Sequence, residues 1–147
     1  MNPNISVLFC DDIRHEVSGK ISLIGVYGSH LIVNEFPAVL TKLCVHMTIT
    51  IPKNALPEAV VVKFSYIGNE LLSTTIPVSN DTNEADPKFN YVKVVGGFEV
   101  NQLNLDKNGV IDVSVEYDDV YMNDAKLYVY DRATFETDVK PFRYQEK

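Results

Sequence analysis

The residues of this chain that could perform chemistry are few, and their spacing matches no catalytic signature. Two cysteines (Cys10 and Cys44) and three histidines (His15, His30 and His46) form no C-x-x-C pair and no zinc-ligand pattern. A G-x-S-x-G nucleophile elbow and a phosphate-binding P-loop are also absent. The sequence therefore predicts a protein that is not an enzyme, with no catalytic residues and no cofactor.

The two cysteines lie in apolar, strand-like runs, which predicts two buried thiols rather than a disulfide framework. Cys44 and His46 share one side of a predicted strand, with Cα atoms about 6.6 Å apart. That separation alone is too little to propose a catalytic dyad.

Carboxylates in the second half of the chain could hold a cation. Residues 104–115 have the turn of an EF-hand loop, but its last position is Val115 instead of glutamate, so a simple turn is favoured. Loops at one end of a sandwich offer another calcium site, from Asp118, Asp119, Asn123 and Asp124 together with Asp81 or Asp86. Two interpretations of these carboxylates therefore remain: a metal site of a metal-dependent enzyme or ion-regulated domain, or an acidic loop that is simply solvated.

Charge and aromatic content favour a protein partner. The formal net charge is −7. Residues 1–80 contain six acidic and five basic side chains, whereas residues 81–147 contain fourteen acidic and eight basic ones, so most of the negative charge lies in the second half. Tyrosine combines an apolar body with a polar tip and is favoured at protein interfaces. We expect an acidic, tyrosine-rich surface to bind another protein, formed by Tyr117, Asp118, Asp119, Tyr121, Tyr128 and Tyr130.

The same acidic balance argues against nucleic acid and anionic membranes as partners. The N-terminus lacks the basic region of a secretory signal, and no apolar run approaches the ~20 residues of a membrane span. The chain is therefore expected to be cytoplasmic, and its oligomeric state is left open.

Hydrophobic periodicity predicts an all-β fold. Residues 42–51 alternate, with Leu43, Val45 and Met47 on one face, and residues 110–117 do the same. About eight short strands follow one another at the spacing of sandwiches and barrels. We predict a single domain over 1–147, an antiparallel β-sandwich, with a small closed β-barrel as the alternative.

Turn signals divide these strands. Residues 11–18 are polar and predict a turn or irregular link, residues 118–124 predict a loop, and Gly68 and Asn69 predict a two-residue hairpin turn. Gly96 and Gly97 predict a bend between two strands. Tyr128 and Tyr130 face away from Leu127 and Val129 in the strand predicted at residues 126–131.

One segment has a specific resemblance. Residues 14–27, RHEVSGKISLIGVY, preceded by FCDD at 9–12, resemble a family of small uncharacterised bacterial and phage proteins with an E-x-x-G-K-x-S-L-x-G-V-Y pattern. The resemblance implies a compact β-sandwich of bacterial or phage origin and implies no activity. A phage origin would suit an acidic inhibitor of a host protein.

The same segment allows a conformational interpretation and a functional one. Gly19 suits a turn with positive φ, and Gly25 inside a strand predicts a bulge or a close backbone approach. In the functional interpretation, a polar cluster at a loop end binds a ligand; its residues are Asp11, Asp12, Arg14 and Glu16.

Overall fold

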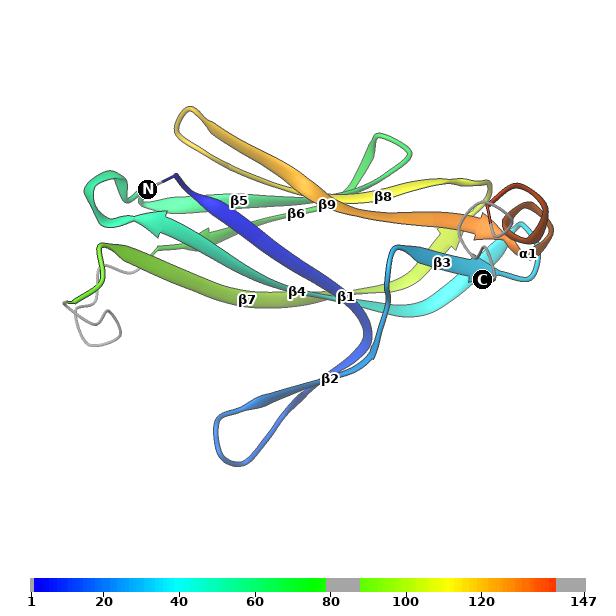
Figure 1. Ribbon diagram of the computed structural model, residues 1–147, viewed down its shortest axis with the longest axis horizontal. Coiled ribbons are helices and arrows are strands. Elements are labelled where there is room, and N and C mark those ends of the chain that lie inside the picture. Colours follow the sequence, from blue (N-terminus) through cyan, green and yellow to red (C-terminus); the bar gives the residue numbers. More distant parts are fainter. Residues whose placement is uncertain (1, 79–87, 140–147) are drawn as a thin grey trace, which may run out of the picture.

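In the computed structural model, two β-sheets stack face to face around one apolar core (Figure 1). The structure describes residues 2–78 and 88–139. One sheet has the order β2-β1-β4-β7, with β1 Asn4–His15, β2 Ile21–Val26, β4 Ala38–Pro52 and β7 Tyr91–Leu105. The other has the order β3-β9-β8-β5-β6, with β3 His30–Val33, β5 Ala59–Tyr66, β6 Asn69–Pro77, β8 Gly109–Tyr117 and β9 Val120–Asp131. The predicted β-sandwich is confirmed, in preference to a closed barrel.

The central strands follow the alternation read from the sequence. Leu43, Val45 and Met47 of β4 are fully buried against Ile111 and Val113 of β8 in the shared core. Each buried aliphatic side chain stabilises the fold by about 1.5–3 kcal/mol relative to an exposed one. The period-two pattern therefore identified the inner faces of both sheets.

One strand pair departs from the antiparallel pattern. Strand β3 pairs with β9 in parallel, and every other strand pair described is antiparallel. The described helices are short: a 3-10 turn at Lys53–Ala55, then Arg132–Thr134 (α1) and a π-helical turn at Phe135–Val139. No helix in residues 2–78 or 88–139 is long and apolar enough to span a membrane.

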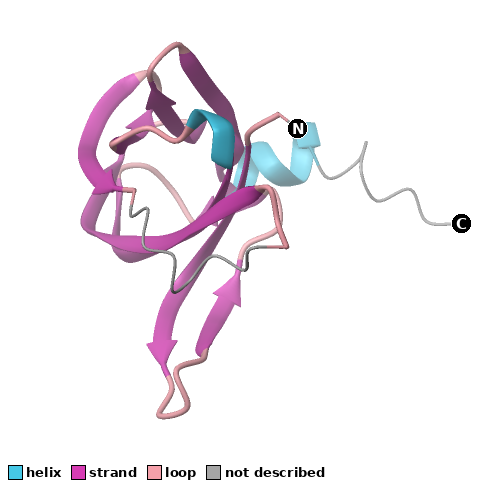
Figure 2. Ribbon diagram, turned by 90° about the vertical axis from the view of Figure 1, so that its left-hand side faces the viewer, coloured by secondary structure: helices cyan, strands magenta, loops and turns pink. Residues whose placement is uncertain are grey.

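The prediction of a polar link at residues 11–18 was wrong at its start. Strand β1 continues to His15 and pairs with β2 over Ile13 and Leu23, and over His15 and Ile21. This end of β1 and the paired β2 form a hairpin that projects from the sandwich (Figure 2). Because a projecting hairpin exposes much of its surface, its strands do not need the apolar alternation by which strands are recognised.

The loop predicted at residues 118–124 was also wrong in most of its length. Only Asp118 and Asp119 form the turn, and β9 begins at Val120. Asp118 has a φ of 47°, a left-handed conformation that aspartate adopts more readily than most residues. The turn between β5 and β6 is likewise one residue earlier than predicted, at Ile67 and Gly68, which have φ values of 52° and 75°.

Strand β7 runs without interruption through Gly96 and Gly97, which pair with Met47 and His46 of β4. The predicted bend at these glycines is therefore absent. The irregularity lies instead at Gln102, whose φ is 55°. Before Gln102, even-numbered residues such as Phe98 face the core. After Gln102, the odd-numbered residues Leu103 and Leu105 are buried there instead. A single left-handed residue thus inverts the alternation, which explains the weak strand signal there.

Candidate functional site

The hairpin of β1 and β2 is held by contacts within the segment that carries the family resemblance. Gly19 has a φ of 83° and donates its N–H to the Glu16 carbonyl at 3.1 Å. The Glu16 carboxylate accepts a hydrogen bond from the Ser22 hydroxyl at 3.0 Å, across the turn. The predicted turn at Gly19 is present, and Glu16 contributes to its geometry.

Gly25 lies beside Asp11 and has a φ of 66°. A Cβ atom at Gly25 would lie 2.2 Å from Oδ2 of Asp11, so a side chain there would overlap the carboxylate. The Tyr27 hydroxyl donates to Oδ1 of the same carboxylate at 3.0 Å. The close approach predicted for Gly25 is therefore present, and it lets a tyrosine and an aspartate meet across the hairpin.

Burial raises the pKa of Tyr27 to about 12, with a further contribution from its hydrogen bond to the Asp11 carboxylate. Asp12 is paired differently: the Lys42 ammonium donates to its Oδ1 at 2.8 Å and lowers the pKa of the Asp12 carboxyl. The two adjacent aspartates thus have separate partners.

The four residues predicted as a polar cluster at a loop end do not form one. Asp11, Asp12 and Arg14 lie in strand β1, Arg14 is exposed, and Glu16 begins the turn. Asp11 contacts Tyr27, Asp12 contacts Lys42 and Glu16 contacts Ser22. The Asp11 and Glu16 contacts hold the hairpin, in agreement with the conformational interpretation, and the Asp12 contact joins β1 to β4.

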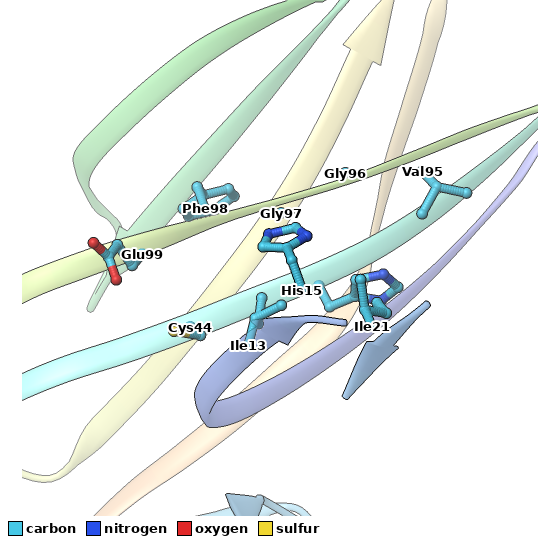
Figure 3. Close-up of a pocket in the computed structure, with 10 residues that line it drawn as sticks. Ile13, His15, Ile21, Cys44, Val95, Gly96, Gly97, Phe98 and Glu99 are labelled. Atoms are coloured by element: carbon cyan, nitrogen blue, oxygen red, sulfur yellow. The ribbon is translucent and has the colours of Figure 1, made fainter. Parts of the chain in front are cut away.

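A pocket of about 310 Å³ lies between this hairpin and the face of β4 and β7 that is turned away from the other sheet (Figure 3). We call it the outer pocket. Ile13 of the hairpin lies above Gly97, where a Cβ atom would be 3.3 Å from Cδ1 of Ile13 and 2.8 Å from the Val45 carbonyl oxygen. The lining residues are Ile13, His15, Ile21, Cys44, His46, Val95, Gly96, Gly97, Phe98 and Glu99.

Cys44 and His46 bring a thiol and an imidazole to the outer pocket. The Cys44 thiol donates to the Asp11 carbonyl oxygen at 3.7 Å, and burial raises its pKa. An activated cysteine has a lowered pKa and a base beside it. Nε2 of His46 is buried and has no hydrogen-bond partner among the described residues.

Exposed aliphatic side chains surround the outer pocket. Leu8 is 43% exposed and pairs with His46 of the pocket, and Val95 and Ile21, which line it, are 61% and 39% exposed. We call these three residues the aliphatic rim.

Sequence reasoning missed this site. The alternation of β4 does place Cys44 and His46 on one side of the strand, but no sequence signal shows that the hairpin folds over them.

The structure separates the residues predicted to form a tyrosine-rich surface. Tyr117 is 7% exposed and belongs to the core, so it does not fit on a docking face. Asp118, Asp119 and Tyr121 are exposed at the tip of the β8–β9 hairpin. Tyr128 lies seven residues further along β9, a distance of about 23 Å in an extended strand.

Tyr130 belongs with Tyr128 at the far end of β9. Its ring lies 5.7 Å from His30 and 6.3 Å from Phe135, measured between ring centroids. The predicted surface is therefore two separate groups, one at the hairpin tip and one beside β3.

The described part of the chain contains no group of three or more histidine, cysteine, aspartate or glutamate side chains that could hold a metal ion. Of the calcium ligands considered from the sequence, Asp118 and Asp119 lie at the hairpin tip, whereas Asp81 and Asp86 lie outside the described residues.

Residues 5–130 match the model of a family of unknown function, DUF6941. The chain belongs to this family. The match covers both sheets, including the hairpin and every residue of the outer pocket. It agrees with the expected membership of an uncharacterised family, and the family carries no assigned activity. Comparison with curated proteins and with solved structures found no match.

Proposed function

We propose that this chain is a non-enzymatic protein-binding module whose partner contacts the outer pocket and the aliphatic rim. The supporting observation is the exposure of Leu8, Ile21 and Val95 around a concave site. Apolar side chains gathered at a pocket are typical of interaction sites, whereas scattered ones are not. A non-enzymatic role agrees with the raised pKa of the Cys44 thiol.

The partner would insert an apolar side chain into the pocket and cover the rim. A volume of about 310 Å³ is near the lower end of the roughly 300–1,000 Å³ of small-molecule sites, so a side chain fills it more readily than a large cofactor.

The test compares two exposed aliphatic residues on different sheets. A partner is captured from a host lysate and purified, and its affinity for each variant is measured by titration calorimetry. Val95→Asp is expected to weaken binding at least tenfold, equivalent to about 1.4 kcal/mol. Leu71→Asp is the matched control, because Leu71 is 50% exposed on β6 of the other sheet. Equal affinity of Val95→Asp and the parent protein would refute the proposed site.

A second candidate surface is the tip of the β8–β9 hairpin, where Tyr121 is 60% exposed next to Asp118 and Asp119. Such a surface suits a basic partner, and its contribution would weaken with added salt. If this tip binds the partner, Tyr121→Ala combined with Asp118→Asn should abolish capture, while Tyr128→Ala at the far end of β9 should not. Capture unaffected by the double substitution would exclude the tip.

A bacterial or phage origin is part of the proposal, with a phage-encoded acidic inhibitor of a host protein as its variant. The support is the E-x-x-G-K-x-S-L-x-G-V-Y pattern and the net charge of −7. Identification of the captured partner tests the variant: an inhibitor should reduce that partner's activity at stoichiometric concentration, and an assembly module should not.

A further inference from the structure

The two cysteines of the chain are directly opposite each other on neighbouring strands. Cys10 of β1 pairs with Cys44 of β4 in the antiparallel register. Opposing Cα atoms in such a pair are about 4.5–5.5 Å apart. Disulfides require a Cα separation of about 4.4–6.8 Å, so the backbone already satisfies this requirement.

Both thiols also point to the same side of the sheet. The Cys10 thiol donates to the Asp12 carbonyl oxygen at 3.5 Å, and the Cys44 thiol donates to the Asp11 carbonyl oxygen at 3.7 Å. Acceptors that are adjacent in sequence place the two sulfur atoms near one another, at the point where β1 leaves β4.

The two thiols differ in their access to solvent. Cys10 is completely buried, whereas Cys44 lines the outer pocket and retains 3% of its exposure. A small reagent that enters the pocket would therefore meet Cys44 first. Cys10, directly across the strand pair, is the only other cysteine of the chain.

We propose that Cys10 and Cys44 are a site of reversible oxidation, at which a hydroperoxide entering the outer pocket converts the two thiols into an intramolecular disulfide. The Cys44 thiolate attacks the peroxide, the O–O bond breaks, and Cys44 becomes a sulfenic acid. The Cys10 thiolate then attacks the Cys44 sulfur, the S–S bond forms, and hydroxide leaves. With hydrogen peroxide, two thiols and one peroxide give one disulfide and two molecules of water.

This inference does not depend on the protein-binding proposal, because it concerns only the register of two strands and access through the pocket. It adds a covalent link between β1 and β4 at the base of the hairpin that covers the pocket. A reducing thiol would reverse the reaction.

The experiment uses the folded, full-length chain. The protein is treated with hydrogen peroxide, quenched with catalase, denatured, alkylated with N-ethylmaleimide and weighed by mass spectrometry. The untreated protein should carry two adducts. The treated protein should carry none, with a mass lower by two hydrogen atoms, and dithiothreitol should restore both adducts. Retention of both adducts, or a dimer linked between chains, would overturn the proposal.

Two variants test the order of events. In Cys10→Ser, the Cys44 sulfenic acid has no thiol to react with, so dimedone should trap it. In Cys44→Ser, oxidation of Cys10 should be at least tenfold slower than oxidation of Cys44 in the parent. Equal rates would overturn the route through the pocket. Circular dichroism establishes that each variant is folded, and the parent protein alone decides whether the disulfide forms.

Discussion

Substitution of Gly25 by alanine tests the geometry of the hairpin most directly. Gly25 has a φ of 66°, and a Cβ atom there would lie 2.2 Å from Oδ2 of Asp11. The carboxylate cannot move aside freely, because its other oxygen accepts the hydrogen bond of the Tyr27 hydroxyl. The alanine variant should therefore suffer from both a strained backbone and a lost contact.

Two contributions make up the expected loss of stability. A left-handed conformation costs an alanine about 1 kcal/mol relative to glycine. Displacing the Asp11 carboxylate removes its hydrogen bond with Tyr27, which contributes about 1 kcal/mol at an exposed position. We therefore expect Gly25→Ala to lower the free energy of unfolding by about 2 kcal/mol, the sum of these two estimates.

Two other glycines of the chain separate these contributions. Gly19 has a φ of 83°, but an added Cβ atom there would have no neighbour within 4 Å, so Gly19→Ala should lose only the backbone part, about 1 kcal/mol. Gly28 has neither a positive φ nor a neighbour within 4 Å, so Gly28→Ala should change stability by less than about 0.5 kcal/mol.

The assay is urea unfolding followed by circular dichroism, with equal slopes required for the compared variants. In an Asp11→Ala background, Gly25→Ala should cost less, about 1 kcal/mol, because the carboxylate is gone and only the Cβ atom of residue 11, 3.1 Å from the added Cβ, remains close. If Gly25→Ala were no more destabilising than Gly19→Ala in the otherwise unchanged protein, the proposed overlap with Asp11 would be refuted.

Further predictions concern titration, redox chemistry and packing. The pKa of Tyr27 is about 12 in the folded chain and near 10 when the chain is unfolded. The neutral Tyr27 side chain therefore contributes its full stabilisation below pH 10, and this stabilisation is lost as the pH rises toward 12. Ultraviolet titration at high pH should show that Asp11→Asn lowers the pKa of Tyr27. Burial raises the pKa of Cys44, so its rate of oxidation should rise about tenfold between pH 7 and 8, measured by the alkylation assay, and a flat profile would contradict the thiolate mechanism. A Cβ atom at Gly109 would lie 2.5 Å from Cγ1 of Ile67. Gly109→Ala should therefore lower the free energy of unfolding, measured in urea, by about 1 kcal/mol or more. When Ile67→Ala is already present, adding Gly109→Ala should cost less.

Several features of the fold and the site follow from the sequence alone. The alternation at residues 42–51 and 110–117 identified the inner faces of β4 and β8, because a period of two is a local property of an extended chain. The same pattern already placed Tyr117 beside Ile111 and Val113, so its burial could have been read from the sequence before it was assigned to a docking surface. Gly25 was also recognisable, since glycine within a strand indicates a close approach.

Other features needed the tertiary structure, because they depend on contacts between distant segments. Residues 11–15 have no apolar alternation, yet they form a strand since β2 supplies their pairing. The outer pocket unites Ile13, Cys44 and Gly97, which are separated by dozens of residues and meet only because the hairpin folds over β4 and β7. Sequence determines which side chains share a face of a strand, whereas register and the path of the hairpin determine what covers that face. The opposition of Cys10 and Cys44 is a matter of register, and a shift of one residue would remove it.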